Sequence, residues 1–236
     1  MRMPNESTPF SENRLLAALA PDERERLTSS SVNLSLELST VLFSPGEKLR
    51  HVYFPTTAVV SLLTALSDRT GMEVGLIGRE GMVGVSAILG GEETKVATVQ
   101  HEGEALRVEA GLVLEEFRRG GTFQRAFLRY THALMAQISQ SVVCNVRHPI
   151  EGRLARWLLM FRDRAGSEQF VLTQEFIANM LGVRRSGISE VANSLQQRGF
   201  ITYQRGHFII LDPKGLEEFA CECYPTVKDK FDNFLL

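Results

Sequence analysis

The chain has 236 residues, of which 44% are hydrophobic and 23% are charged, and its formal net charge is −2. This composition excludes a disordered or low-complexity chain and predicts a globular protein with a substantial core. The sequence has no signal-peptide pattern and no apolar stretch of about 18 residues, so we expect a cytoplasmic protein that does not enter a membrane.

Two short helices are predicted near the N-terminus. Leu15, Leu16 and Leu19 would give the first helix an apolar face. Pro21 followed by two acidic residues is typical of the start of the second.

From about residue 31 to residue 108 the pattern changes to short runs of β-branched and aromatic residues, separated by turns that contain glycine. Several short strands at near-regular spacing predict a sandwich or a barrel-like roll. The clearest runs are residues 52–54, 58–66, 72–77 and 96–100.

A long helix is predicted from Thr122 to Val146, because no glycine or proline interrupts this segment and its apolar residues recur at steps of three and four. Pro149 closes this helix or starts the next one. A long helix with a narrow apolar stripe often pairs with its own copy, so we expect a homodimer through Thr122–Val146. The alternative is a helix that packs on its own β-roll. The stripe comprises Phe123, Ala126, Phe127, Tyr130, Ala133, Leu134, Ile138, Ser141, Val142 and Asn145.

Residues 173–195 have the pattern of a helix-turn-helix. Thr173 can cap the first helix, Gly182 ends it in the left-handed conformation, and the second helix begins near Arg184. The second helix has a buried stripe at helical spacing. That stripe is formed by Ile188, Val191, Ala192 and Leu195.

Two apolar runs after this helix, residues 200–203 and 207–211, flank the tight turn Gln204-Arg205-Gly206 and predict a hairpin that would form a wing. On the exposed face of the second helix, an arginine could read guanine with two hydrogen bonds, and a serine could reach a base or a phosphate. Arg205 would contact a phosphate, or be a solvated turn charge. The candidate DNA-binding residues are Thr173, Gln174, Arg184, Arg185, Ser186, Ser189, Glu190 and Arg205.

The three cysteines are too few, and odd in number, for a disulfide framework. Cys221 and Cys223 form a CxC pair, with no second pair and no nearby histidine to complete a zinc site. We therefore expect Cys144, Cys221 and Cys223 to be reduced structural thiols, with a redox or metal sensor as the alternative.

The tail from Leu216 to Leu236 is predicted to form an amphipathic helix that caps the DNA-binding domain.

In this order and spacing, the motifs resemble those of a Crp/Fnr-type transcription regulator over about residues 20–215. The resemblance implies an α+β fold with an N-terminal cyclic-nucleotide-binding-type β-roll, a central dimerisation helix and a C-terminal winged helix-turn-helix. The implied divisions are residues 1–121, 122–148 and 149–236. It also implies a symmetric dimer on pseudo-palindromic double-stranded DNA, with RNA polymerase as a partner if the protein is an activator. The motifs are residues 43–47, 52–54, 78–84, the long helix, residues 152–155 and residues 173–201.

The chain departs from the nucleotide-binding members of that family at the pocket. Their Gly-Glu and Arg-Ser pairs correspond here to the segments 84–87 and 94–97, which lack the glutamate and offer only Lys95 in place of the arginine. Cyclic AMP is therefore not expected as the effector, whose identity and existence stay open. The N-terminus has no cysteine for an iron–sulfur cluster. The candidate effector-pocket residues are Gly84, Val85, Ser86, Lys95, Val96, Ile138 and Ser139.

The sequence thus predicts a homodimeric, sequence-specific DNA-binding regulator, and any effector is expected to act at the β-roll and to be other than cyclic AMP. The alternative is a sensor module that regulates a protein partner rather than DNA. An enzyme is not expected, because no nucleophile–base pair, metal-ligand spacing or phosphate loop is present. In the cyclic-AMP-dependent members of the family, the second helix of the helix-turn-helix carries an acidic residue and a second arginine, which correspond here to Ser186 and Glu190. We therefore expect this chain to prefer a DNA half-site different from theirs.

Overall fold

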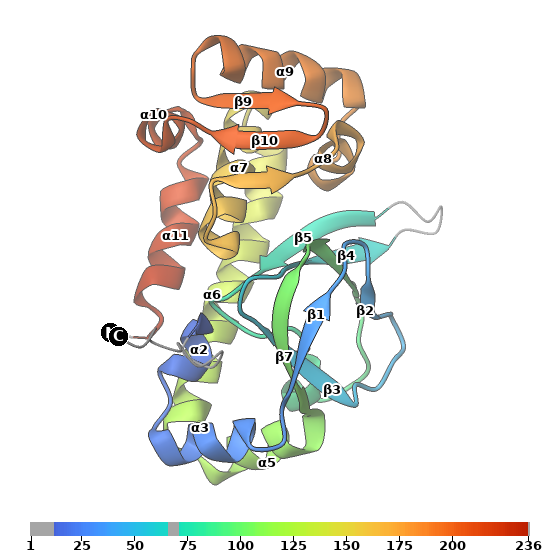
Figure 1. The fold of residues 1–236 in the computed structure, drawn as a ribbon, viewed down its shortest axis with the longest axis vertical. Helices are drawn as coiled ribbons and strands as arrows, with labels where there is room; N and C mark the ends of the chain where they lie inside the picture. The colour runs from blue at the N-terminus through green and yellow to red at the C-terminus, as the bar shows by residue number, and fades with distance from the viewer. Residues whose placement is uncertain (1–11, 66–70, 236) are drawn as a thin grey trace, which may run out of the picture.

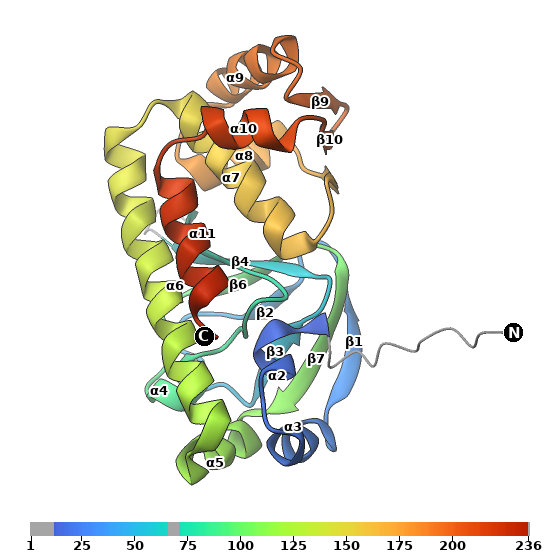
Figure 2. The same cartoon turned by 90° about the vertical axis from the view of Figure 1, so that its left-hand side faces the viewer.

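A computed structural model describes residues 12–65 and 71–235. A β-roll lies at one end of the molecule and a helical domain with a small sheet lies at the other (Figure 1). The long helix α6 (Gly121–Arg147) runs along one side, and α11 (Cys223–Asn233) lies beside it (Figure 2). None of the described helices is long and apolar enough to cross a lipid bilayer.

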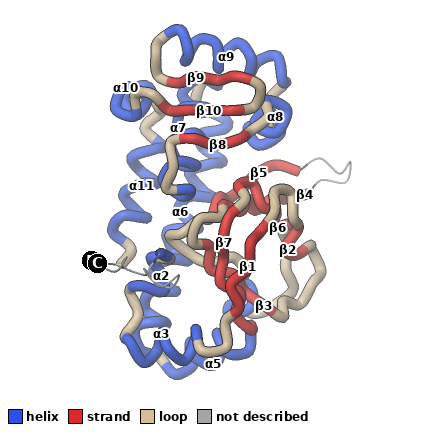
Figure 3. Tube along the Cα trace, in the orientation of Figure 1, coloured by secondary structure: helices blue, strands red, loops and turns tan. Residues whose placement is uncertain are grey.

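The predicted strands of the β-roll are confirmed, and they form two antiparallel sheets in the strand orders β1-β7-β3 and β2-β6-β4-β5 (Figure 3). Alternate side chains of a strand face the shared core, as with Val52 and Phe54, which are both fully buried. Leu66, the end of one predicted run, lies outside the described residues. The strands are β1 (Val32–Leu36), β2 (Val41–Phe43), β3 (His51–Pro55), β4 (Val59–Ala65), β5 (Gly71–Ile77), β6 (Val96–His101) and β7 (Gly103–Glu109).

The helices around the roll include the two predicted near the N-terminus and two that the sequence pattern did not indicate. The predicted pair is α2 (Arg14–Ala17) and α3 (Pro21–Thr28). The additional helices are α4 (Ser86–Leu89) and α5 (Ala110–Arg119), the second of which leads directly into α6. Pro149 starts the next helix, α7 (Ile150–Ala165), at its N-cap position.

The apolar stripe of α6 is mostly buried within its own chain. Its residues from Phe123 to Leu134 are buried, and the Tyr130 hydroxyl donates a hydrogen bond to the Met82 carbonyl oxygen at 2.9 Å. The expectation that this stripe pairs with a second copy is therefore wrong for its N-terminal part, because those side chains fill the interface with the roll and with α11. A different face of α6 is exposed, as described below.

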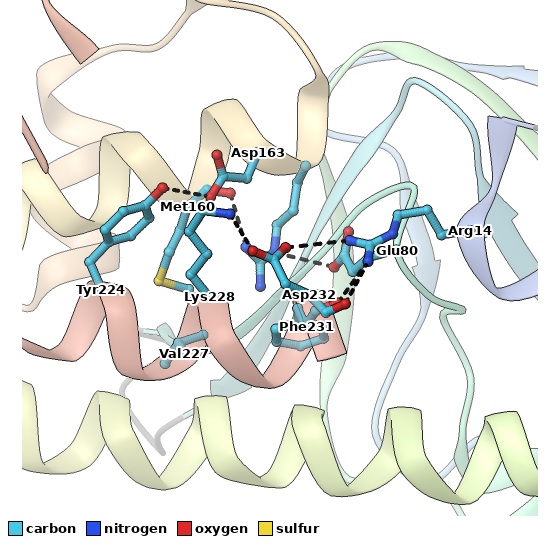
Figure 4. Close-up of a pocket in the computed structure, with 10 residues that line it drawn as sticks. Arg14, Glu80, Met160, Asp163, Tyr224, Val227, Lys228, Phe231 and Asp232 are labelled. Atoms are coloured by element: carbon cyan, nitrogen blue, oxygen red, sulfur yellow. Dashed lines mark hydrogen bonds and ion pairs between the residues drawn. The ribbon is translucent and has the colours of Figure 1, made fainter. Parts of the chain in front are cut away.

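The C-terminal tail forms two helices instead of one. Helix α10 (Pro213–Phe219) packs on α7, whereas α11 runs back along α6 towards the N-terminal helices. The Arg14 guanidinium donates to the Phe231 carbonyl oxygen at 2.9 Å, and Asp232 and Glu80 lie around the same small pocket (Figure 4). The tail therefore packs on the DNA-binding domain, as predicted, and in addition connects that domain to α6 and to the N-terminal helices.

Glu23 of α3 caps the first turn of α6 from a distant part of the sequence. Its carboxylate accepts hydrogen bonds from the backbone N–H groups of Thr122, at 2.8 Å, and Phe123, at 3.0 Å, and from the Thr122 hydroxyl. Burial opposes ionisation of this carboxyl, but these hydrogen bonds together lower the pKa of Glu23 below its ordinary value of 4.5. The ionised side chain therefore stabilises the start of the long helix.

We expect Glu23→Gln to lower the free energy of unfolding at neutral pH by about 1–3 kcal/mol, because hydrogen bonds to a charged group are lost at a helix start. A carboxyl with a lowered pKa in the folded state contributes stability above its ordinary pKa and loses it as the pH falls through the folded value. The difference between wild type and variant should therefore shrink below about pH 4.5. Urea unfolding across pH 3–8 checks this, with exposed Glu25→Gln on the same helix as the control. An equal loss in both variants would contradict the capping role.

Candidate nucleic-acid interface

The helix-turn-helix is present where the sequence predicts it, as α8 (Gln174–Leu181) and α9 (Arg185–Gln197). The Thr173 hydroxyl oxygen accepts a hydrogen bond from the Phe176 N–H at 3.1 Å, which caps α8. Gly182 ends α8 with φ of +63°, a left-handed conformation that favours glycine. The predicted stripe on α9 is buried against the rest of the domain, so its opposite face is left to solvent.

The exposed face of α9 carries the candidate base-reading residues. Arg184 is the N-cap residue, Arg185 begins the helix, and both are exposed together with Ser186 and Glu190. Within the described ranges, no ion pair neutralises either arginine. The first turn of α9 therefore presents two free positive charges at an outer edge of the molecule (Figure 1).

Ser189 lies on the same face but is only partly exposed. Its hydroxyl donates to the Gln174 side-chain oxygen at 2.5 Å, which links the start of α8 to the middle of α9. The structure therefore brings together Gln174 and Ser189, two of the candidate DNA-binding residues. In this structure their side chains are hydrogen-bonded to each other. An oxygen of Ser189 can still accept a hydrogen bond from a ligand.

The predicted wing is also present. Strands β9 (Ile201–Gln204) and β10 (His207–Ile210) form a hairpin, and β8 (Gln169–Val171) completes a three-stranded sheet in the order β8-β10-β9. The two turn residues, Arg205 and Gly206, have φ of +49° and +88°. Positive φ at both positions is the requirement of a two-residue type I′ hairpin turn, in which arginine is an unfavourable choice. Arg205 is exposed at the tip, where it has no partner among the described residues.

The candidate effector pocket is arranged around a residue that the sequence reasoning missed. Glu93 is buried, and its carboxylate accepts hydrogen bonds from the Ser86 hydroxyl at 2.8 Å and from the backbone N–H groups of Thr94 and Lys95 at 2.8 and 3.2 Å. The Lys95 ammonium lies 3.9 Å from the same carboxylate. The Glu93 carboxylate thus occupies the hydrogen-bond donors that would otherwise bind an anionic ligand. The only sequence signal was an acidic residue directly before Thr94-Lys95.

The other pocket candidates come from three parts of the chain. Gly84 and Val85 precede the short helix α4, and Val96 begins β6. Ile138 is half-buried on α6 and Ser139 is exposed, and in the described part of the chain no hydrogen bond joins either one to Ser86 or Lys95.

The cysteines are not isolated in the structure. Cys144, Cys221 and Cys223 converge with His148, so the expectation of no nearby histidine is corrected by the fold, which brings the end of α6 next to the α10–α11 connection. The hydrogen bond from Cys221 lowers the pKa of the Cys144 thiol below its ordinary value, and the charge of Arg156 acts in the same direction. Among the described residues, these four form the one group whose side chains are of the types, and close enough together, to bind a metal ion.

Comparison with known proteins locates the helix-turn-helix within a family. Residues 152–219 match the model of the Crp-like helix-turn-helix domain. Among curated proteins, none is similar enough in sequence to match this chain.

Solved structures share the whole architecture at low sequence identity. FixK2 from Bradyrhizobium japonicum is similar with a TM-score of 0.70 and 15% identity, covering 81% of this chain and 98% of its own. TTHB099, a Crp-family transcriptional regulator from Thermus thermophilus, gives 0.65 and 20%, with coverage of 79% and 96%. A regulator of the Crp/Fnr family from Eubacterium rectale gives 0.63 and 17%, with coverage of 89% and 98%.

Proposed function

Because this chain carries a Crp-like helix-turn-helix domain on the fold of the Crp/Fnr transcription regulators, we propose that it is a cytoplasmic, sequence-specific DNA-binding regulator that acts as a homodimer. The observation that carries the proposal is the pair of exposed arginines at the start of α9, which have no ion-pair partner among residues 12–65 and 71–235. In a helix-turn-helix this turn enters the major groove, where arginine can pair with the O6 and N7 atoms of guanine.

The other candidate residues take complementary roles in this proposal. Ser186 lies next to Arg185 on the exposed turn, and Glu190 is placed to accept from a cytosine amine or to orient Arg185. Thr173 and Gln174, at the positive N-terminal end of α8, contact the DNA backbone. Arg205 at the wing tip binds a phosphate in the flanking groove.

The proposed dimer uses the face of α6 that its own chain leaves uncovered. Leu128, Met135, Val142 and Val146 are exposed by 51%, 62%, 61% and 79%, respectively. They follow one another at steps of seven, seven and four residues, which is the spacing of a coiled-coil seam. Pairing two copies along this seam removes an apolar stripe from water and presents two α9 helices to half-sites about 34 Å apart, one turn of the duplex.

In this proposal, residues 1–121 form the sensor domain, residues 122–148 the dimerisation helix and residues 149–236 the DNA-binding domain. Any effector would act at the roll. Cyclic AMP is a poor fit, because Glu93 already places a carboxylate on Ser86 and on the backbone donors near Lys95. A second anion at that place would meet electrostatic repulsion from Glu93. We therefore propose that any effector is something other than cyclic AMP and that the chain binds DNA without it.

The test is selection of genomic DNA fragments by the purified full-length chain without added ligand. We expect enrichment of fragments that share a pseudo-palindromic motif, and an affinity that falls steeply with salt concentration because phosphate contacts release counterions. Sedimentation of the protein–DNA complex should give two chains per site. Failure to enrich a motif without added ligand would reject effector-independent binding, and failure also with cyclic nucleotides or a cell extract added would reject sequence-specific DNA binding.

Arg205 offers a test of the wing. We expect Arg205→Asn to raise the free energy of unfolding by up to about 1 kcal/mol, because asparagine tolerates the left-handed conformation better than arginine does. The same variant should bind selected DNA more weakly and reduce the slope of log affinity against log salt by about 0.9 for each wing that loses a phosphate contact. Urea unfolding and affinity measurements at several salt concentrations check both effects.

Arg205→Lys is the control for this experiment, since it keeps the charge in the same backbone conformation. It should retain most of the salt dependence. If Arg205→Asn binds DNA with an unchanged slope, the arginine is a solvated turn charge and the wing contact is rejected.

A further inference from the structure

The four residues at the joint between the long helix and the C-terminal domain form a compact group of soft ligand atoms. Cys144 lies in the last turn of α6, and His148 is the C-cap residue of that helix, with its backbone N–H donating to the Cys144 carbonyl oxygen. Cys221 lies in the connection between α10 and α11, and Cys223 is the first residue of α11. One ligand atom from each residue lies within 4.8 Å of the others.

The spacing inside this group matches a tetrahedral site. The Cys144 and Cys221 sulfur atoms are 3.5 Å apart, and the Cys223 sulfur lies 3.4 Å from His148 Nδ1. Zinc bonds of about 2.3 Å to sulfur and 2.0–2.1 Å to nitrogen place the ligand atoms of a tetrahedral Cys3His site roughly 3.5–3.8 Å from one another. The other distances in the group are at most 4.8 Å, so side-chain shifts of no more than about 1 Å would bring all four atoms to a common centre.

Two neighbouring side chains are placed where outer partners of metal ligands are found. The second ring nitrogen of His148, Nε2, lies 3.5 Å from the Glu222 carboxylate, which would fix the tautomer that leaves Nδ1 free to bind. The Gln140 side-chain amide donates to the Cys223 sulfur at 3.1 Å. A carboxylate behind the histidine and a hydrogen bond to a thiolate are the usual outer partners of a metal site.

The charge balance also indicates an anionic group at this place. Arg153 and Arg156 of α7 are buried, and the Nε atom of each has no hydrogen-bond partner. Neither arginine forms a direct ion pair with a carboxylate in the described part of the chain, although the buried Glu73 carboxylate interacts electrostatically with Arg156. Both arginines also interact electrostatically with the Cys144 sulfur. Buried cations require compensation. Three thiolates and one divalent cation would supply a single net negative charge beside them.

We propose that Cys144, His148, Cys221 and Cys223 bind one Zn²⁺ ion, or a thiophilic divalent ion of the same kind, in a closed Cys3His site. Four protein ligands leave no open position, so the site is structural and not catalytic. The ion would join the end of α6 to the α10–α11 connection and would fix the tail against the joint between the roll and the DNA-binding domain. This proposal is independent of the proposed DNA binding.

The test uses the full-length chain, reduced and stripped of metal by a chelator, and then titrated with Co²⁺ under anaerobic conditions. We expect about one Co²⁺ bound per chain, with the visible absorption of a tetrahedral ion and near-ultraviolet sulfur-to-metal charge transfer. Zn²⁺ should displace the cobalt and raise the melting temperature of the metal-free chain, because it binds the folded state.

Variants define the ligands. Cys221→Ser and His148→Asn change the two least buried members of the set, and each should lower Co²⁺ affinity at least 100-fold. Glu222→Gln should lower it by about 10–100-fold, as expected for an outer partner of a ligand. His132→Asn is the matched control, since this exposed histidine lies on the same helix and should leave binding unchanged.

Three results would overturn the assignment. The first is a wild-type chain that is folded by circular dichroism, has all three thiols reduced, and binds neither Co²⁺ nor Zn²⁺. The second is equal metal affinity in wild type, Cys221→Ser and His148→Asn, which would place the metal elsewhere. The third is a Cys144–Cys221 disulfide that forms in preference to metal binding, which would make the pair a redox element.

Discussion

Arg185→Ala is expected to abolish selective DNA binding while leaving the fold intact. Arg185 is exposed and, within the described residues, has no ion-pair partner to lose, so its removal should cost no measurable stability. A bidentate arginine–guanine contact contributes roughly 1–3 kcal/mol of discrimination, and a dimer makes two of them. The variant should therefore lose about 2–6 kcal/mol of selectivity, or about 30-fold to 10⁴-fold in relative affinity.

The measurement is the ratio of affinities for a selected fragment and for a scrambled fragment of equal length, at one salt concentration. Arg118→Ala is the charge-matched control, because Arg118 is an exposed arginine on α5 at the opposite end of the molecule from α9 (Figure 1). The control should keep the wild-type ratio. If Arg185→Ala keeps it as well, α9 does not read bases through Arg185, and the placement of the recognition helix is wrong.

The helix-turn-helix and the wing could be predicted from sequence because their signals are local. The cap at Thr173, the left-handed Gly182 and the turn at Arg205-Gly206 each specify backbone conformation within a few residues. The buried stripe of α9 has an unbroken helical period, so its exposed face follows by elimination. How that face meets DNA stays a prediction.

The strands of the roll could also be predicted, but the contacts that define its pocket could not. Alternation and glycine-containing turns indicate strands, whereas the position of Glu93 among its donors depends on how the chain folds back between α4 and β6. A sequence pattern shows an acidic residue there and does not show that its carboxylate is turned inward.

The joint between the two ends of the molecule was the least predictable part. The apolar residues of α6 at helical spacing fit both a dimer seam and an intramolecular interface, and periodicity cannot separate these two uses. The structure buries the N-terminal part of that stripe and exposes the face from Leu128 to Val146. Similarly, Cys144 and Cys221 are 77 residues apart in sequence, so only the return of the tail along α6 brings them together.

Arg164 is the residue that most directly connects the C-terminal domain to the roll. It is buried at the end of α7, and its guanidinium lies 3.3 Å from the Glu80 carboxylate. It also donates to the Leu76 carbonyl oxygen at 2.7 Å and to the Gln137 side chain of α6. The ring of Phe231, on the returning tail, lies 5.0 Å from the guanidinium and covers it.

We expect Arg164→Met to lower the free energy of unfolding by about 3–5 kcal/mol, because it leaves the buried Glu80 carboxylate without its cation and removes several hydrogen bonds. For a chain of this size the melting temperature should fall by roughly 6–20 °C. The junction of β5, α6, α7 and α11 should loosen first, so amide exchange should rise there before it rises at the wing. Differential scanning calorimetry and hydrogen exchange give the two measurements.

The double variant Glu80→Gln/Arg164→Met separates the lost ion pair from a packing defect. Removing the negative charge together with the cation eliminates the unpaired buried carboxylate, so the double variant should be more stable than Arg164→Met alone. If both variants are destabilised equally, the cost comes from lost packing under Phe231 and lost bonds to Leu76, and the ion pair contributes little. A loss below about 1 kcal/mol in Arg164→Met would show that the roll and the C-terminal domain are held together chiefly by the tail helix and by the apolar contacts of α6.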